Sequence, residues 1–238
     1  MNYTWHFEVV WRNLYPLFYS GMLMTFQLTL SAFLLGLIAG TLAAFGRLSR
    51  YRLIRAAFTA YVEFVRNTPF LVQLYLVYFG FSSFQFDLRS LGLAPYRIDF
   101  TPFQSALIAL VFNTGGYTAE IVRAGIQAVS HGEIEAAQST GLSFLQITRF
   151  IVLPRALVIV YAPLVNQLIL TLLGSSVASL VTVPELSFQA EWLNYKTFRT
   201  LEIYIGLGLM YLLLNWAVAL FFYLMRRACL RRPLPQIP

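Results

Sequence analysis

Few residues in this chain have the type and spacing that covalent chemistry needs. The sequence holds one cysteine, Cys229, and two histidines, His6 and His131, which lie far apart. A single cysteine excludes an intrachain disulfide and any metal site built from cysteines. No G-x-x-x-x-G-K-[ST] loop, which would hold nucleotide phosphates, occurs in the chain. We therefore expect no catalytic residue, no metal site and no cofactor here, and we expect that the chain is not an enzyme.

Side chains that can bind a ligand lie inside a long apolar stretch. Amide and hydroxyl groups recur there near helical spacing, at Asn166, Gln167, Ser175, Ser176 and Ser179. Polar side chains are unfavourable in lipid, so they should face protein or a solute path. Serines and other small residues also let membrane helices pack closely. The pattern supports a substrate path and helix packing equally.

A polar segment, residues 125–155, carries strong helix signals and several charges. Ser130 and Ser143 each precede a Glu or Gln by three residues, which is the spacing of a capping box. Gly141 lies between them and is suited to end a helix, because glycine adopts left-handed backbone angles at little cost. The segment is therefore predicted to form a short helical hairpin outside the membrane. Such a hairpin is either a plain connector or a docking element.

The elements that must position these residues are membrane helices. Hydrophobic residues make up 58% of the 238 residues and charged residues only 11%, whereas a soluble domain carries about a quarter charged residues. A helix crosses the hydrocarbon core in about 20 apolar residues. Five uncharged stretches reach that length, at residues 13–46, 67–86, 100–119, 156–184 and 203–225. We predict an all-α integral membrane protein with about five transmembrane helices, forming a single domain over residues 1–238.

The basic residues are distributed unevenly around these stretches. If the chain crosses the membrane at each stretch, eleven arginines lie on one side and five Lys or Arg residues on the other. Cytoplasmic loops carry the excess of Lys and Arg, so we predict a cytoplasmic C-terminus and an N-terminus outside. This distribution of basic residues explains the net charge of +7. We expect a lipid bilayer as partner and no nucleic acid. Residues 52–66 could lie along the interface or begin the second span.

The hairpin residues are similar to one family signature. Glu135, Ala136 and Ala137, with Gly141 four residues on and Pro154 further on, resemble the EAA loop of the permease subunits of bacterial ABC importers. The resemblance implies that Glu135 and Gly141 form the core of a contact with an ATPase, shaped by Ala136, Ala137 and Pro154. It identifies residues 125–155 as the coupling loop.

Other segments resemble the polar amino-acid (histidine/glutamine type) permeases of the same group. Residues 63–74, EFVRNTPFLVQL, are similar to that subfamily's E-x-x-R-G-T-P-x-L-V-Q-L segment, and residues 120–129 and 183–186 match two further segments. Asn67 stands where the subfamily has glycine, which reduces backbone freedom. Residues 172–177, LLGSSV, lack the lysine and aspartate of the usual L-K-D-T-S-L.

The resemblance implies a type I ABC importer permease in the bacterial cytoplasmic (inner) membrane, crossing it several times. The implied partners are a cytoplasmic ABC ATPase dimer that carries ATP and magnesium, a second permease subunit, identical or homologous, and a periplasmic or lipid-anchored solute-binding protein. Glu185 and Glu191 are candidates for docking that binding protein, although ordinary solvated loop charges explain them equally well.

The expected cargo is a polar amino acid or a related small amide. A cationic side chain in a dry site needs a carboxylate partner, and the fourth apolar stretch has none. A neutral or acidic amino acid is therefore favoured, unless a different permease partner supplies the recognition site. Two alternatives stay open: an ion-coupled secondary carrier, and an ABC permease for a solute that is not an amino acid.

Overall fold

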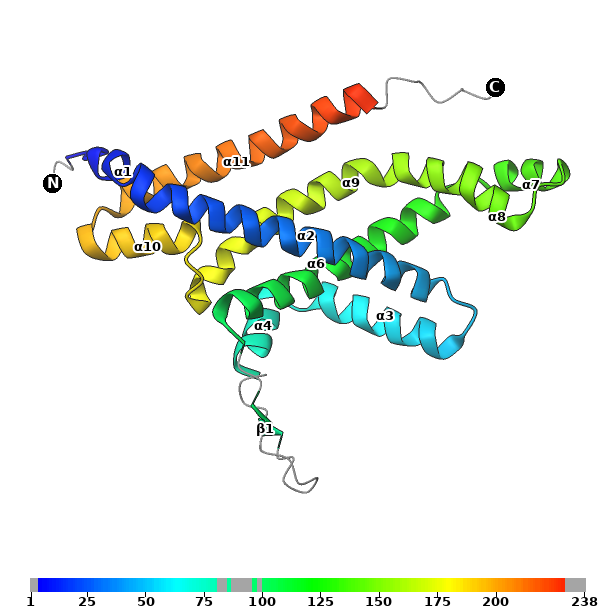
Figure 1. The fold of residues 1–238 in the computed structure, drawn as a ribbon, viewed down its shortest axis with the longest axis horizontal. Helices are drawn as coiled ribbons and strands as arrows, with labels where there is room; N and C mark the ends of the chain where they lie inside the picture. The colour runs from blue at the N-terminus through cyan, green and yellow to red at the C-terminus, as the bar shows by residue number, and fades with distance from the viewer. Residues whose placement is uncertain (1–3, 81–84, 87–95, 98–99, 230–238) are drawn as a thin grey trace.

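The computed structural model describes residues 4–80, 85–86, 96–97 and 100–229, and this part of the chain is almost entirely helical (Figure 1). Two strands of two residues each pair as a small antiparallel ribbon. In chain order the elements are α1 (Glu8–Arg12), η1 (Leu14–Tyr19), α2 (Ser20–Arg47), α3 (Arg52–Asn67), α4 (Phe70–Tyr75), η2 (Leu76–Gly80), β1 (Gln85–Phe86), β2 (Tyr96–Arg97), α6 (Pro102–Gln127), α7 (His131–Ser139), α8 (Phe144–Ile147), η4 (Thr148–Val152), α9 (Leu153–Gly174), η5 (Ser175–Val181), α10 (Leu186–Thr197) and α11 (Thr200–Cys229). The predicted all-α fold is confirmed.

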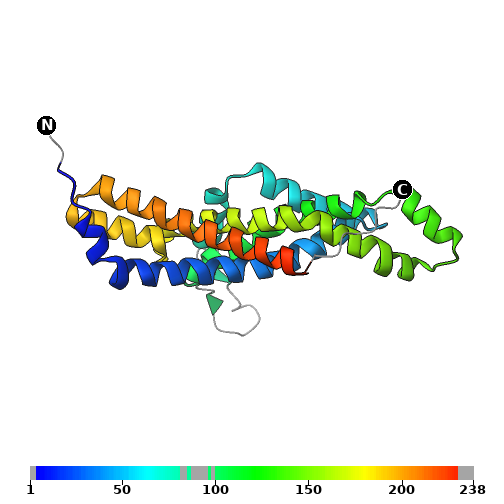
Figure 2. The same cartoon turned by 90° about the horizontal axis from the view of Figure 1, so that it is seen from above.

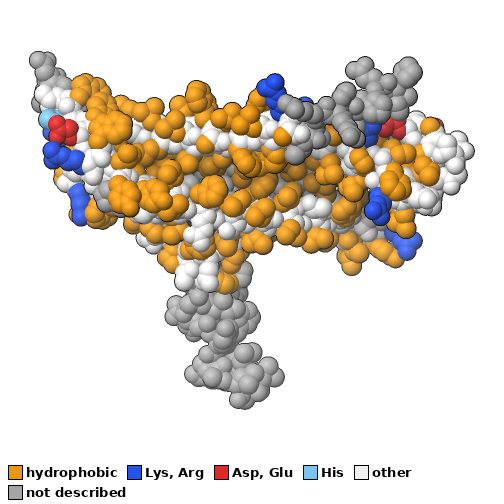
Figure 3. Space-filling view, turned by 45° about the horizontal axis from the view of Figure 1, so that its top comes forward, with side chains coloured by type: hydrophobic (Ala, Val, Ile, Leu, Met, Phe, Trp, Pro, Cys, Tyr) orange, Lys and Arg blue, Asp and Glu red, His pale blue; other side chains and the backbone are white. Residues whose placement is uncertain are grey.

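Four helical segments are long and apolar enough to cross a membrane. They cover Leu17–Arg47, Pro102–Gln127, Phe144–Val181 and Thr200–Ala228, and they correspond to the first, third, fourth and fifth predicted stretches. Hydrophobic side chains cover the middle of the face in Figure 3, and most charged side chains on it lie towards the two ends. This is the surface that a bilayer-spanning bundle needs.

The second predicted stretch is not one helix. Among the described residues its apolar helix covers Phe70–Gly80. The chain breaks at Thr68 and Pro69, both in extended conformation, because the residue before a proline disfavours helical angles. The helix before the break, α3, packs on the bundle, with Phe58 against Gly46 and Val65 against Gly116.

Close packing of α2 on α6 forms the centre of the bundle. A side chain at Gly36 or Gly40 would collide with Thr114 or Thr118, since an added Cβ would lie 2.8 Å and 2.6 Å from the respective threonine Cβ atoms. Small residues four positions apart allow two membrane helices to approach in this way. The two helices provide the fixed frame against which α3, α4 and α9 pack.

The two ends of the bundle have different structures. At one end α1, η1 and α10 cluster with the start of α11 through Val10, Phe18, Leu186 and Ile203. At the opposite end α7 and α8 extend beyond the other helices (Figures 1 and 2). Helix α1 therefore lies at the end away from the predicted coupling hairpin, and α11 runs towards the hairpin end. Which end faces the cytoplasm remains a prediction from the arginines.

Candidate functional site

The predicted hairpin is present and its two helices are capped by serines. The Ser130 hydroxyl accepts a hydrogen bond from the Glu133 backbone N–H at 3.2 Å. At Ser143 both bonds of a capping box are formed, with Gln146 as the partner. The Glu133 side chain does not complete the first predicted box. It pairs instead with Arg155 at 3.3 Å, which ties α7 to the first turns of α9.

The turn between the helices depends on Gly141. Its φ of +80° lies in the left-handed region that glycine adopts without a steric penalty. The backbone N–H of Gly141 donates to the Gln138 carbonyl at 2.9 Å, and that of Leu142 donates to the Ala137 carbonyl at 3.4 Å. Both bonds satisfy carbonyl groups at the end of a helix. The prediction that Gly141 ends the first hairpin helix is confirmed.

The remaining predicted coupling residues divide into two groups. Glu135 and Ala136 are exposed, whereas Ala137 is buried. Ala136, Ala137 and Pro154 line one groove between α7 and the start of α9, while Glu135 lies outside that lining. Pro154 does not end a helix. It lies at the start of α9, directly after the π-helical turn η4 and inside the continuous helical segment Phe144–Val181, where its missing N–H removes one helical hydrogen bond.

Large apolar side chains on this hairpin are exposed. Phe144 is 80% exposed, Leu145 78% and Phe150 64%. An apolar patch of this kind on a polar element marks a surface that a partner covers. Sequence reasoning concentrated on the Glu-Ala-Ala signature and missed these three residues. The position of Phe144 and Leu145 directly after the cap at Ser143 was a signal that could have revealed these two.

A small polar cavity lies between α4, α6 and α9. Its volume is about 260 Å³, and Asn113, Thr114, Tyr117, Gln167 and Thr171 supply its polar groups beside Phe70, Leu110, Leu170 and Gly174. No charged residue lines it. The Thr114 and Thr171 hydroxyls are 3.0 Å apart, and the Asn113 amide donates to Gln73 at 3.0 Å. The cavity thus offers hydroxyl and amide groups held on rigid helices.

Gln167 has the most informative environment in this cavity. Its side chain is only 5% exposed, yet it forms no hydrogen bond with any residue that the structure describes. An amide that lines a cavity without a protein partner keeps its hydrogen-bonding groups available to a ligand. A polar ligand in the cavity would satisfy it.

The other predicted path residues lie elsewhere. Asn166 is exposed, and the Ser175 and Ser176 hydroxyls bond to carbonyls three residues earlier, each at 2.7 Å. Ser179 donates to Glu191 at 3.4 Å. The structure therefore brings only Gln167 of the five into the cavity. Asn113 and Thr114 of α6 line the cavity beside it.

The two predicted docking glutamates differ completely in exposure. Glu191 is exposed, but Glu185 is 0% exposed, so the prediction that Glu185 docks a protein at the surface is wrong. Its carboxylate caps α10 by accepting a hydrogen bond from the Phe188 N–H at 2.8 Å. Burial raises the pKa of Glu185 above its ordinary value, although hydrogen bonds from the α10 backbone, Tyr211 and Thr25 oppose this.

The family of the chain is shown by comparison with known proteins. Residues 32–232 match the family described as binding-protein-dependent transport system inner membrane component. The chain belongs to this family. It is therefore an inner-membrane transport component that crosses the membrane several times, and its role is transport rather than catalysis.

Relatives of this transport component include several amino-acid permeases. It is 35% identical to the nopaline transport system permease protein NocM of Agrobacterium fabrum, over 86% of this chain and 84% of that protein. It is 30% identical to the glutamine transport system permease protein GlnP of Escherichia coli, over 95% and 96%. The resemblance to polar amino-acid permeases is confirmed.

Solved structures agree with this membership. An amino acid ABC transporter crystallised with histidines matches with a TM-score of 0.83 and 32% identity, over 95% of this chain and 100% of the other. The methionine ABC transporter MetNI matches at 0.66 and 19% identity, over 92% and 95%. The second match supports the fold alone. The type I ABC importer fold expected for the permease is thus shown.

Proposed function

We propose that this permease imports a neutral polar amino acid or a related small amide, driven by ATP hydrolysis on a separate ABC ATPase dimer. The observation that carries the proposal is the uncharged polar cavity around the unpartnered Gln167. Its volume of about 260 Å³ is slightly below the range of about 300–1,000 Å³ for larger ligands, which suits a small solute. Glutamine and cystine permeases among the relatives support this class of cargo.

The absence of charged residues from the lining of the cavity narrows the class of cargo further. A cationic or anionic side chain would lose its hydration there without an ion-pair partner in the lining. A neutral amide or hydroxyl side chain would instead exchange hydrogen bonds with Gln167, Asn113 and the threonines. This reasoning favours a neutral cargo over an acidic one.

The hairpin supports the coupling part of the proposal. Phe144 and Leu145 supply exposed apolar area, and Glu135 supplies an exposed charge on the same rigid element. ATPase closure can move the permease only if the ATPase contacts the two states of the bundle differently. Because the hairpin is continuous with α9 through α8 and η4, a force on α8 would reach the helix that carries Gln167.

The complete assembly would contain two permease subunits, two ATPases and a solute-binding protein, in a bacterial inner membrane with the N-terminus outside. Reconstitution of these proteins in vesicles tests the proposal. We expect ATP-dependent uptake of glutamine. Excess arginine or glutamate should not compete with this uptake. Uptake that needs an ion gradient and no ATPase would show the carrier alternative instead.

A further inference from the structure

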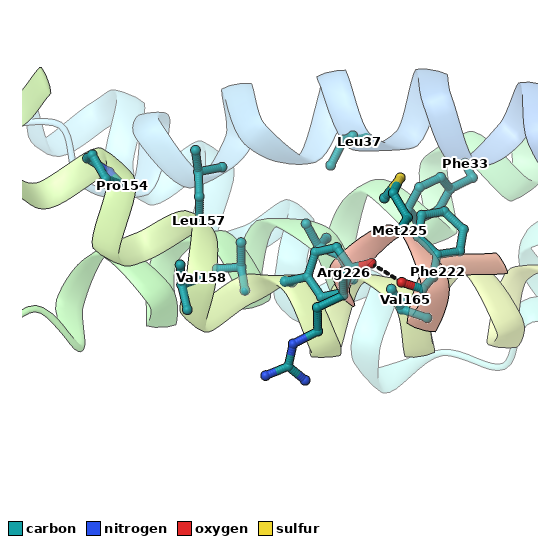
Figure 4. Close-up of a pocket in the computed structure, with 12 residues that line it drawn as sticks. Phe33, Leu37, Pro154, Leu157, Val158, Val165, Phe222, Met225 and Arg226 are labelled. Carbon is teal, nitrogen blue, oxygen red and sulfur yellow. Dashed lines mark hydrogen bonds between the residues drawn. The ribbon is translucent and has the colours of Figure 1, made fainter. Parts of the chain in front are cut away.

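A narrow apolar groove runs between α2, α9 and α11 in the hairpin half of the bundle (Figure 4). Its volume is about 550 Å³, and its walls include Phe33 from α2, Leu157 and Val165 from α9, and Phe222 from α11. Tyr161 also lines it, but its hydroxyl already donates to the Phe222 carbonyl at 2.6 Å. The groove therefore offers no free hydrogen-bonding group along its walls and suits a hydrocarbon occupant.

The groove continues towards the middle of the bundle. A second apolar cavity of about 470 Å³ shares Phe33 and Phe222 with it and extends along α11 to Leu214. From Arg226, at the mouth of the first groove, to Leu214 the helix rises about 18 Å at about 1.5 Å per residue. Half of the hydrocarbon core is about 15 Å thick. The groove thus has the length of one leaflet.

Arg226 places a positive charge at the mouth of this groove. Its side chain is exposed and forms no ion pair or hydrogen bond with any described residue. Three other arginines near this end are paired: Arg47 and Arg123 with Glu120, and Arg155 with Glu133. In Figure 4 the guanidinium group extends away from Phe33 and Leu37. An anion that reached the groove mouth would meet an unpaired cation.

We propose that this groove binds an acyl chain of an anionic phospholipid from the leaflet on the hairpin side, with the lipid phosphate held by Arg226. An apolar slot of one-leaflet length, with an arginine at its mouth that pairs with no described residue, complements a lipid in both shape and charge. A second copy of the chain fits less well. It would bring its own arginines to the same level, and like charges would repel across the contact.

Native mass spectrometry of the full chain, purified with the subunits that accompany it, tests this site. The detergent contains phosphatidylglycerol and phosphatidylcholine in equal amounts and with identical acyl chains. The chain should retain phosphatidylglycerol preferentially. Arg226→Gln should reduce that retention about fivefold, since one cation near an anionic surface contributes about 1 kcal/mol and 1.4 kcal/mol is tenfold. Arg227→Gln, which removes an adjacent charge outside the groove lining, should leave the retention unchanged.

A second pair of variants tests the acyl chain. Leu157→Trp should reduce retention of both lipids by obstructing the groove, whereas Ile159→Trp should not. Ile159 is exposed on the same helix but lies outside the lining. Equal effects within either pair would overturn the proposal. Displacement of the retained phosphatidylglycerol by soluble glycerol phosphate at the same concentration would also overturn it. A disulfide that joins Leu157→Cys to a second copy of the chain, in protein that retains no lipid, would do the same.

Discussion

The Tyr211 hydroxyl donates a hydrogen bond of 2.9 Å to the Glu185 carboxylate, which joins α11 to the residue that caps α10. The Thr25 hydroxyl of α2 donates to the same carboxylate oxygen at 3.3 Å, and it accepts from the Leu186 N–H at 3.0 Å. One buried carboxylate thus holds three helices together at the end of the bundle away from the hairpin.

Glu185→Ala should therefore destabilise the protein. The change would leave the Phe188 N–H without its acceptor, which is unfavourable by about 1–3 kcal/mol, and it would remove one of the two partners of the Tyr211 hydroxyl, which keeps Ser187 at 3.0 Å. We expect a lower thermal midpoint in detergent by several degrees. Glu191→Ala, at an exposed position of the same helix, should change the midpoint little. A Glu185→Ala variant as stable as Glu191→Ala would contradict this role.

The raised pKa of Glu185 predicts a pH dependence of stability. A raised pKa means that the folded protein binds the proton more tightly than the unfolded chain does. The stabilisation is thus fully present below the ordinary pKa of about 4.5 and is lost as the pH rises through the folded value. The melting temperature of wild type minus that of Glu185→Gln should therefore fall as the pH rises above about 4.5. A difference independent of pH would show that Glu185 does not titrate in this range.

Glu135→Lys should abolish ATP-dependent uptake while membrane insertion stays intact. Glu135 is exposed on α7, so the change does not disturb packing, but it reverses a charge on the proposed ATPase surface. Loss of a charge pair and a new like-charge contact should weaken ATPase binding at least tenfold. Gln138→Lys, at another exposed position of α7, is the control for added charge. Normal uptake by Glu135→Lys would rule out a coupling role for this residue.

Gln167→Ala should raise the KM for uptake about fivefold. It removes one hydrogen bond of about 1 kcal/mol from the cavity between α4, α6 and α9. Asn166→Ala removes a neighbouring amide that is exposed outside this cavity, and it should leave the KM unchanged. If the two variants behave alike, the cargo does not contact Gln167.

Local signals in the sequence were sufficient for several parts of the fold. Gly141 and Ser143 act through backbone bonds to residues within five positions, so their roles as helix stop and helix cap could be predicted. Pro69 acts equally locally, because a proline disfavours helical angles at the residue before it, here Thr68. Residues 52–66 could not be placed, because only contacts such as Val65 with Gly116 show that α3 packs on the bundle.

The residues of the candidate site also divide into those that local sequence signals predicted and those that only the structure revealed. Helical spacing indicated that Gln167 faces protein or a path, but it could not separate Gln167 from Asn166 or from the serines, since all lie on one apolar helix. Glu185 was predicted to be a surface charge because its partners, Thr25 and Tyr211, are 160 and 26 residues away in the chain.

By itself the sequence determined that the chain is a helical membrane protein with a capped polar hairpin, because hydropathy, arginine distribution and capping depend on neighbouring residues. Only the tertiary structure decided which polar groups converge on a cavity, which glutamate is buried and that Arg226 lies at the mouth of an apolar groove. Those properties arise when α2, α6, α9 and α11 pack together, and packing joins residues that no local pattern connects.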